Sequence, residues 1–147
     1  MQPRTLERST VLAATPGQVW AAIGDFGGLA DWHPHIKPST IEDDADPAVP
    51  GAVRVFTVDG RIVARERLLD RDPDARWYSY ALLPPVVLPV AEFVATLAVH
   101  PHADVAEVRW SAVYQGTDEV VPQVESLFGD GTYGAGLDAL RTLFSQS

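Results

Sequence analysis

The sequence contains no cysteine and a single lysine, Lys37. A chain without cysteine has no disulfide framework, no thiolate zinc site and no cysteine nucleophile. A Schiff-base mechanism would have Lys37 as its one candidate. Phosphate-binding loops and dinucleotide fingerprints are also missing, so we expect no nucleotide cofactor, and the sequence indicates no cofactor of another kind.

Long apolar runs and positive charge are scarce as well. No apolar run approaches the roughly 18–20 residues that a membrane-spanning helix needs. The first residues, Met1-Gln2-Pro3-Arg4, lack the apolar stretch of a signal peptide, which favours a cytoplasmic location. The formal net charge is −9. Binding to nucleic acid or to an anionic membrane is therefore not expected, because both depend on Lys and Arg meeting phosphates.

The length of 147 residues suits one domain, residues 1–147, with enough apolar surface for a core. The hydrophobic content of 46% and the charged content of 21% are those of an ordinary globular protein. Acidic residues concentrate in the run 42–46. This run lacks the alternating oxygen ligands of a calcium loop, so we interpret it as a solvated loop.

The N-terminal segment predicts a strand followed by a capped helix. Apolar and polar residues alternate from Leu6 to Leu12, which is the period of a strand. Thr15 can cap the next helix, with Pro16 at its first position and Gln18 completing a capping box. The expected buried stripe of this helix is Val19, Trp20 and Ile23.

The middle of the chain predicts a sheet. Gly27-Gly28 should end the first helix, and a short second helix is expected from Leu29 to Trp32. Period-two segments then predict strands at 52–58, 61–70, 76–83, 91–100 and 106–115, in a mostly antiparallel sheet. Asp59-Gly60 is a strong hairpin signal. The apolar, proline-rich segment 83–89 suits a stiff lid over a pocket mouth, or a loop that only packs on the surface.

One long helix, from Glu119 to Phe144, should follow the sheet and cover its apolar face. Where the inward strand residues are bulky and partly polar, a pocket often remains between the two layers. Each glycine inside such a helix costs about 0.5–1 kcal/mol relative to alanine. Either the helix breaks at its glycines or another part of the chain approaches its backbone there. These glycines are Gly129, Gly131, Gly134 and Gly136.

Glu66 is a candidate buried carboxylate. By the two-residue period, Ile62, Ala64, Glu66 and Leu68 share the inward face of their strand, while Val63, Arg65, Arg67 and Leu69 share the solvent face. A buried carboxylate must find a partner or become partly protonated. It is therefore either a functional group or half of a structural ion pair with an Arg or a His.

Inward aromatic residues with polar tips suit a half-wet cavity, because a hydroxyl or indole N–H can orient a ligand. The alternative is a filled core whose hydroxyls bond to the backbone. The inward candidates for ligand binding are Tyr78, Tyr80, Phe93, Trp110 and Tyr114, joined by Phe128 of the last helix.

His33 and His35 flank a proline, so in an extended segment both side chains would point the same way. That spacing occurs in metal sites, but no third ligand has an evident spacing, and we expect no metal. His33 could instead act as a general acid or base with Glu66 as its partner. Trp32 and His35 are further candidates for ligand contact. His100 and His102 precede an expected turn and are assigned to the surface.

Several motifs occur in a characteristic order: a helix ending in Trp32-His33-Pro34, then Gly51-Ala52-Val53-Arg54, Glu66-Arg67-Leu68-Leu69, Asp72 and Tyr80, Trp110-Ser111-Ala112, and Gly136-Leu137-Asp138-Ala139-Leu140. This order resembles the START-related (SRPBCC) superfamily of helix-grip proteins over nearly the whole chain. Its members include polyketide cyclases, lipid-transfer domains, birch-pollen-allergen-like proteins and plant abscisic acid receptors.

The resemblance implies an α+β helix-grip fold, in which a curved seven-stranded antiparallel sheet wraps around a long C-terminal helix. Two short helices after strand 1 would close one end of a cavity. In the receptor branch, three ligand-contact positions correspond to His33, Glu66 and Trp110. The chain departs from the receptors in two places: Asp59-Gly60 replaces a longer gate loop, and His33 replaces a basic ligand anchor.

Three functions remain open on the sequence. The first is a cyclase or dehydratase acting on a polyketide-like or aromatic substrate, with His33 and Glu66 moving a proton. The second is a non-catalytic carrier or sensor of an apolar small molecule. The third is an interaction role with a filled interior. The expected partner is a small hydrophobic or aromatic molecule, and the expected assembly is a monomer or homodimer.

Overall fold

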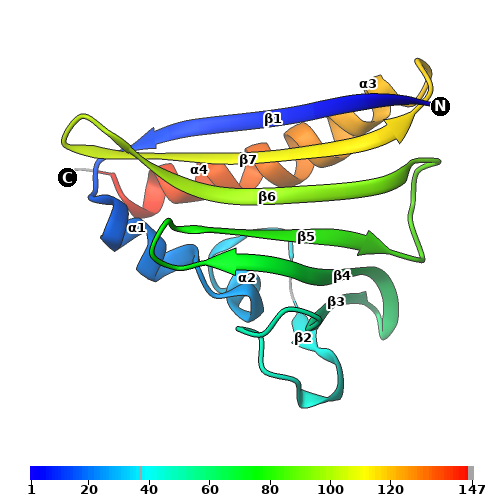
Figure 1. The fold of residues 1–147 in the computed structure, drawn as a ribbon, viewed down its shortest axis with the longest axis horizontal. Coiled ribbons are helices and arrows are strands. Elements are labelled where there is room, and N and C mark those ends of the chain that lie inside the picture. Colours follow the sequence, from blue (N-terminus) through cyan, green and yellow to red (C-terminus); the bar gives the residue numbers. More distant parts are fainter. Residues whose placement is uncertain (37, 146–147) are drawn as a thin grey trace.

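The computed structural model describes residues 1–36 and 38–145; Lys37, the candidate for Schiff-base chemistry, lies outside them. Within the described residues, seven strands form one antiparallel sheet in the order β1-β7-β6-β5-β4-β3-β2. Figure 1 shows this sheet in front, with the C-terminal helix and the first two helices behind it. The strands are β1 (Gln2–Leu12), β2 (Ser39–Ile41), β3 (Val53–Val58), β4 (Arg61–Asp72), β5 (Trp77–Leu83), β6 (Ala91–His102) and β7 (Val105–Gly116).

The helices follow the predicted order. After β1 come α1 (Pro16–Ile23), the 3₁₀ turn η1 (Phe26–Gly28) and α2 (Leu29–Trp32), and a second 3₁₀ turn, η2 (Glu42–Asp44), precedes β3. The C-terminal helix is continuous through α3 (Val121–Val124), the π-helical η3 (Glu125–Gly134) and α4 (Ala135–Leu143). This arrangement confirms the helix-grip fold. No helix in the described part of the chain is long and apolar enough to cross a membrane.

Local sequence signals account for the start of α1. The Thr15 side chain accepts a hydrogen bond from the Gln18 amide, and the Gln18 side chain accepts one from the Thr15 amide, so the capping box is confirmed. The helix ends at Gly24, earlier than the predicted Gly27-Gly28. The reason is a second cap: the Asp25 side chain accepts from the Gly27 amide and starts η1.

The hairpin between β3 and β4 turns on Asp59 and Gly60, whose φ angles are 52° and 78°. Positive φ at both central residues matches the twist of the flanking strands. Phe56 pairs with Ala64 and Thr57 with Ile62, which leaves Val63 in a β-bulge. The prediction that Ile62 faces inward was therefore wrong. It is 49% exposed, while Val63, expected on the solvent face, lines a cavity and is 39% exposed.

The glycines do not break the C-terminal helix, and two of them, Gly129 and Gly136, allow close approach of other parts of the chain. A Cβ atom on Gly136 would lie 2.8 Å from the His33 ring and 3.0 Å from the Trp110 ring. A Cβ atom on Gly129 would lie 2.5 Å from the Arg8 guanidinium. Arg8 also binds Glu125 at 3.1 Å, which holds the helix on β1.

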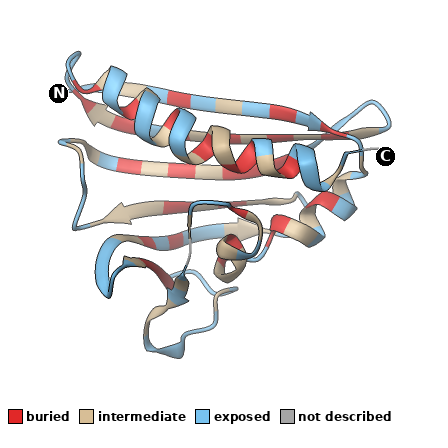
Figure 2. Cartoon of the chain, turned by 180° about the vertical axis from the view of Figure 1, so that it is seen from behind, coloured by how far each residue is buried: buried red, intermediate tan, exposed pale blue. Residues whose placement is uncertain are grey.

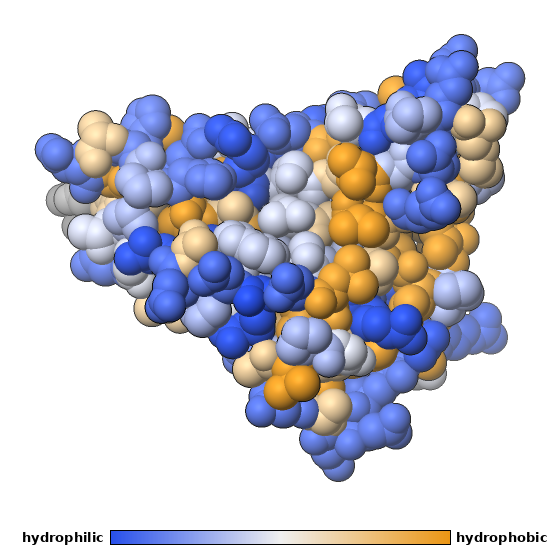
Figure 3. Space-filling model, in the orientation of Figure 1, coloured by the Kyte–Doolittle hydropathy of each residue, from blue (hydrophilic) through white to orange (hydrophobic). Residues whose placement is uncertain are grey.

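The core lies between the helix and the concave face of the sheet. Figure 2, seen from the helix side, shows the C-terminal helix lying across the sheet, with buried residues at intervals along the helix and the strands. The opposite face of the sheet also bears apolar residues, which form a hydrophobic band in Figure 3. Val113 and Leu69 are among the large apolar side chains that remain exposed in the described chain.

Candidate functional site

A cavity of about 310 Å³ lies between the sheet and the C-terminal helix. Its walls come from the segment after α2, from β3 to β7, from the β5–β6 loop and from η3. Most of the wall is aliphatic or aromatic. The lining residues that carry polar side-chain groups are His35, Thr57, Glu66, Tyr80, Trp110, Thr132 and Tyr133.

Glu66 forms a buried ion pair with Arg54. The Arg54 Nε donates to Glu66 Oε1 at 2.7 Å, and the Arg54 side chain is 0% exposed. Burial raises the pKa of the Glu66 carboxyl, while the charge of Arg54 opposes that rise. The prediction that Glu66 is buried is confirmed, and its partner is an arginine.

Aromatic rings surround the Arg54 guanidinium. Its carbon lies 4.2 Å from the centre of the Phe26 ring and 4.5 Å from that of Tyr80. Nη1 donates to the Phe26 carbonyl at 3.2 Å and to the Tyr78 hydroxyl at 3.1 Å. Nη2 is buried without a hydrogen-bond partner in the described chain. These contacts fix the cation, and through it they fix the orientation of Glu66.

Two tyrosine hydroxyls lie near the carboxylate end of the cavity. The Trp110 indole N–H donates to the Tyr80 hydroxyl at 3.0 Å. The Tyr133 ring stacks on Trp110, with 4.5 Å between the ring centres. Burial raises the pKa of both tyrosines, so at neutral pH their hydroxyls are protonated. They can donate hydrogen bonds to a carbonyl or hydroxyl oxygen of a ligand.

His33 is fully buried and both of its ring nitrogens are engaged. Nε2 lies 2.6 Å from the Thr132 carbonyl, so it carries the proton and donates. Nδ1 accepts from the His35 amide at 3.1 Å. Burial lowers the pKa of His33, which keeps the ring neutral. In the geometry shown, His33 ties the segment after α2 to η3, and its hydrogen bonds go to these two backbone groups and not to Glu66.

The predicted site residues, His33 and Glu66 as catalytic groups and the others as ligand contacts, divide into two groups. Tyr78, Tyr114, Trp32 and His33 are absent from the cavity wall. Tyr78 supports Arg54, Tyr114 stacks on Phe93 with 5.5 Å between ring centres, and Trp32 packs on Trp110. The residues that line the cavity are His35, Glu66, Tyr80, Phe93, Trp110 and Phe128.

Sequence reasoning missed Arg54 and Tyr133 as parts of the site. Arg54 lies between Val53 and Val55 in a strand whose side chains are buried on both faces. A charged residue in such a run signals a buried pair. Tyr133 lies four residues before Leu137 and seven before Leu140, and all three are buried, which is the period of an inward helical face.

The predicted lid contributes to the cavity. Pro85, Val86 and Val87 of the β5–β6 loop line it, and Val87 is 63% exposed. A lid role for the segment 83–89 stays a prediction. No group of three or more His, Cys, Asp or Glu residues in the described chain is placed to hold a metal ion.

The chain matches a family model over residues 3–145, and the family is described as polyketide cyclase / dehydrase and lipid transport. None of the curated proteins matches the sequence. Among solved structures, a protein from Thermobifida fusca is 36% identical with a TM-score of 0.87, and the alignment covers 95% of this chain and 92% of that one.

Two further structures are similar to this chain. The XoxI protein from Bacillus cereus is 28% identical with a TM-score of 0.76, covering 98% of this chain and 96% of its own. Norcoclaurine synthase from Thalictrum flavum, solved in complex with dopamine and hydroxybenzaldehyde, is 23% identical with a TM-score of 0.75, covering 99% and 90%. This last likeness is one of fold. The chain belongs to the polyketide cyclase / dehydrase and lipid transport family of the START-related helix-grip superfamily.

Proposed function

We propose that this protein binds a small, mostly apolar molecule between sheet and helix and catalyses its cyclisation or dehydration by acid–base chemistry. One observation supports the proposal: Glu66, the one buried carboxylate among the described residues, lies in the wall of a largely apolar cavity of about 310 Å³. The family description supports the reaction class. A cavity that holds a flexible substrate in a near-attack conformation also needs few catalytic groups.

Glu66 is the proposed base. Its carboxylate would remove a proton from a carbon beside a carbonyl, and the enolate would attack a second carbonyl of the same molecule to close a ring. The alkoxide then takes the proton back from Glu66. In a dehydration, Glu66 removes a further carbon-bound proton and returns it to the departing hydroxide, which leaves as water. A raised pKa suits such a cycle of loss and return.

Tyr133 is the proposed hydrogen-bond donor to the carbonyl oxygen on which negative charge develops. Its hydroxyl stays protonated because burial raises its pKa. The packing of its ring on Trp110 holds it in place. Since the hydrogen bonds of His33 go to backbone groups, we propose it as a positioning residue for η3, in place of the general base considered from the sequence.

A non-catalytic carrier is the second candidate function. The ion pair between Glu66 and Arg54 favours this function, because a carboxylate paired with a buried cation is a weaker base than an unpaired one. In this case Glu66 and the tyrosines would only orient the polar end of a bound ligand.

Turnover of a synthetic aryl triketone, separated from spontaneous cyclisation by chromatography and mass spectrometry, tests the two functions. The enzyme hypothesis predicts that Glu66→Gln abolishes catalysed product while the triketone still binds, and that Tyr133→Phe slows it about 10²-fold. Glu92→Gln changes an exposed carboxylate on β6 and should leave the rate unchanged. Binding without any catalysed product in the wild type, or an unchanged rate in Glu66→Gln, would contradict catalysis by Glu66.

A further inference from the structure

A second hollow lies outside the helix–sheet cavity and shares no wall residue with it. Its volume is about 310 Å³. It lies between α1, η1, the loop before β3 and the far end of β4. Phe26 lies between the two sites: it borders the hollow, while its ring packs on the Arg54 guanidinium and its carbonyl accepts from Arg54. The wall residues are Trp20, Ala21, Gly24, Asp25, Phe26, Pro47, Ala48 and Arg71.

A β-bulge brings Arg71 into this hollow. Leu68 pairs with Tyr80 and Asp70 with Ser79, which leaves Leu69 without a partner across the strands. Strict alternation from the buried Leu68 would turn Arg71 outward, but the bulge shifts the phase by one residue. Arg71 is consequently opposite Tyr78, on the inner side, and half-buried. Its guanidinium has no hydrogen-bond or ion-pair partner in the described chain.

The same hollow contains an anionic group and an aromatic wall. Asp25 uses Oδ1 to accept from the Gly27 amide at 2.9 Å, and its second oxygen has no partner among the described residues. Asp25 and Arg71 do not form an ion pair with each other. The Trp20 ring is fixed against Gly24, where an added Cβ would lie 2.5 Å from it.

We propose that this hollow binds a small zwitterion with an apolar body, of the α-amino-acid type. Arg71 would take the carboxylate in a two-pronged hydrogen bond, Asp25 would take the ammonium group, and the apolar body would lie on Trp20. A simple anion fits less well, because Asp25 and the net charge of −9 repel it. A simple cation leaves the half-buried guanidinium of Arg71 without a partner.

Three probes that share a phenyl group distinguish a zwitterion from a simple anion and a simple cation. They are L-phenylalanine, phenylacetate and phenethylamine. Binding is followed by NMR through the indole N–H of Trp20, at concentrations up to about 20 mM, since a small contact of this kind is expected to have a millimolar Kd. L-phenylalanine should bind at least about tenfold more tightly than either singly charged probe, because each of these loses one charge-assisted hydrogen bond.

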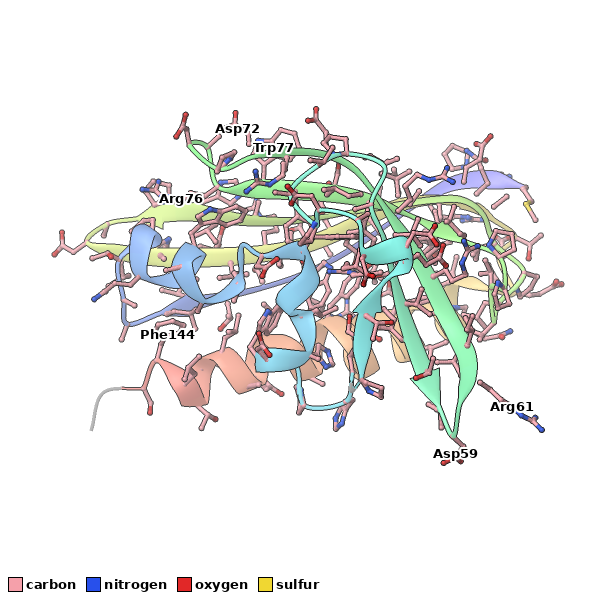
Figure 4. All side chains as sticks on the ribbon, turned by 90° about the horizontal axis from the view of Figure 1, so that it is seen from below. Asp59, Arg61, Asp72, Arg76, Trp77 and Phe144 are labelled. Carbon is pink, nitrogen blue, oxygen red and sulfur yellow. The ribbon has the colours of Figure 1, made fainter. Side chains whose placement is uncertain are left out.

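Two variants test whether L-phenylalanine binds in this hollow. Asp25→Asn keeps an oxygen for the Gly27 amide, so η1 should stay folded, and Arg71→Gln changes a partly exposed side chain. Each substitution should weaken the binding of L-phenylalanine about tenfold or more. Arg76→Gln, in the β4–β5 turn labelled in Figure 4, is the matched control and should bind like the wild type. Absence of binding by all three probes, equal binding of phenylacetate, or unchanged affinity in both Asp25→Asn and Arg71→Gln would overturn the proposal.

Discussion

The two ends of the helix–sheet cavity differ in burial and in polarity. At the inner end, Glu66, Arg54 and the surrounding tyrosines are buried and linked by hydrogen bonds and ring contacts. At the mouth, the wall consists of aliphatic side chains that remain exposed and are not tied to polar partners. These are Val58, Val63, Val86, Val87 and Leu127. The inner end fixes groups in space, and the mouth leaves room for an apolar ligand to pass.

Removing one half of the inner ion pair should have the largest effect on stability. Glu66→Ala leaves the Arg54 cation buried and unpaired, and we expect a loss of about 3–5 kcal/mol in the free energy of unfolding. Urea denaturation measures it.

Two controls sharpen this prediction. Glu42→Ala breaks the partly exposed pair with Arg65, whose Nε lies 2.6 Å from the Glu42 carboxylate, and should have a much smaller effect because solvent screens this pair. The double variant Arg54→Met/Glu66→Leu should recover most of the loss, because no charge is then buried. A loss in Glu66→Ala no greater than in Glu42→Ala would show that the inner end is not organised by this pair.

The next largest effect on stability is expected when a methyl group is added at Gly136. Its Cβ would meet the rings of His33 and Trp110, which are themselves packed, so we expect Gly136→Ala to cost about 1–3 kcal/mol. Gly17→Ala, in α1, meets nothing within 4 Å and should be neutral or slightly stabilising. Equal melting temperatures for the two variants would mean that the helix does not press on the inner end as described.

His33 should make stability depend on pH. Because burial lowers its pKa below 6.5, the unfolded chain binds a proton that the folded chain does not. Stability should therefore fall as the pH drops below about 6.5, by up to about 1.4 kcal/mol per pH unit until the folded pKa is reached. The dependence of the free energy of unfolding on pH should become weaker in His33→Asn. It should persist in His100→Gln, which changes an exposed histidine. A steep slope retained in His33→Asn would assign the effect to other groups.

The mouth should respond in binding kinetics and hardly in stability. Val87→Ser should change the free energy of unfolding by no more than about 0.5 kcal/mol, since the side chain is mostly exposed. Replacing Pro84-Pro85 with Gly-Ser should alter the association and dissociation rates of a cavity ligand measured by stopped flow. Identical rates in this variant and the wild type would contradict the prediction that the segment 83–89 acts as a lid.

The sequence predicted those features that depend on neighbours along the chain. The capping box at Thr15 and the Asp59-Gly60 turn are local, and both are as expected. It did not predict β2, because three residues carry little periodicity. Figure 4 shows the β3–β4 hairpin projecting to the tip marked by Asp59 and Arg61, where its register begins.

The partner of Glu66 could not be read from the sequence because it depends on a bulge. Counting back from the turn without interruption would place Arg54 opposite Arg65, two like charges. The bulge at Val63 shifts the register by one residue and brings Glu66 opposite Arg54 instead. The same shift turns Ile62 outward. The hydrogen bond from His33 to the Thr132 carbonyl escaped prediction because the two residues are 99 positions apart in the chain.

Filling the cavity tests its role most directly. Ala64 lies in the cavity wall on β4, and Ala64→Phe should occupy the space while leaving the Arg54–Glu66 pair in place. The measurement is calorimetric titration of 2-naphthol, a neutral aromatic with one hydroxyl, into the wild type and into this variant. We predict one site in the wild type and its loss in folded Ala64→Phe. Equal binding in the two proteins, or none in the wild type, would contradict a ligand-holding cavity between sheet and helix.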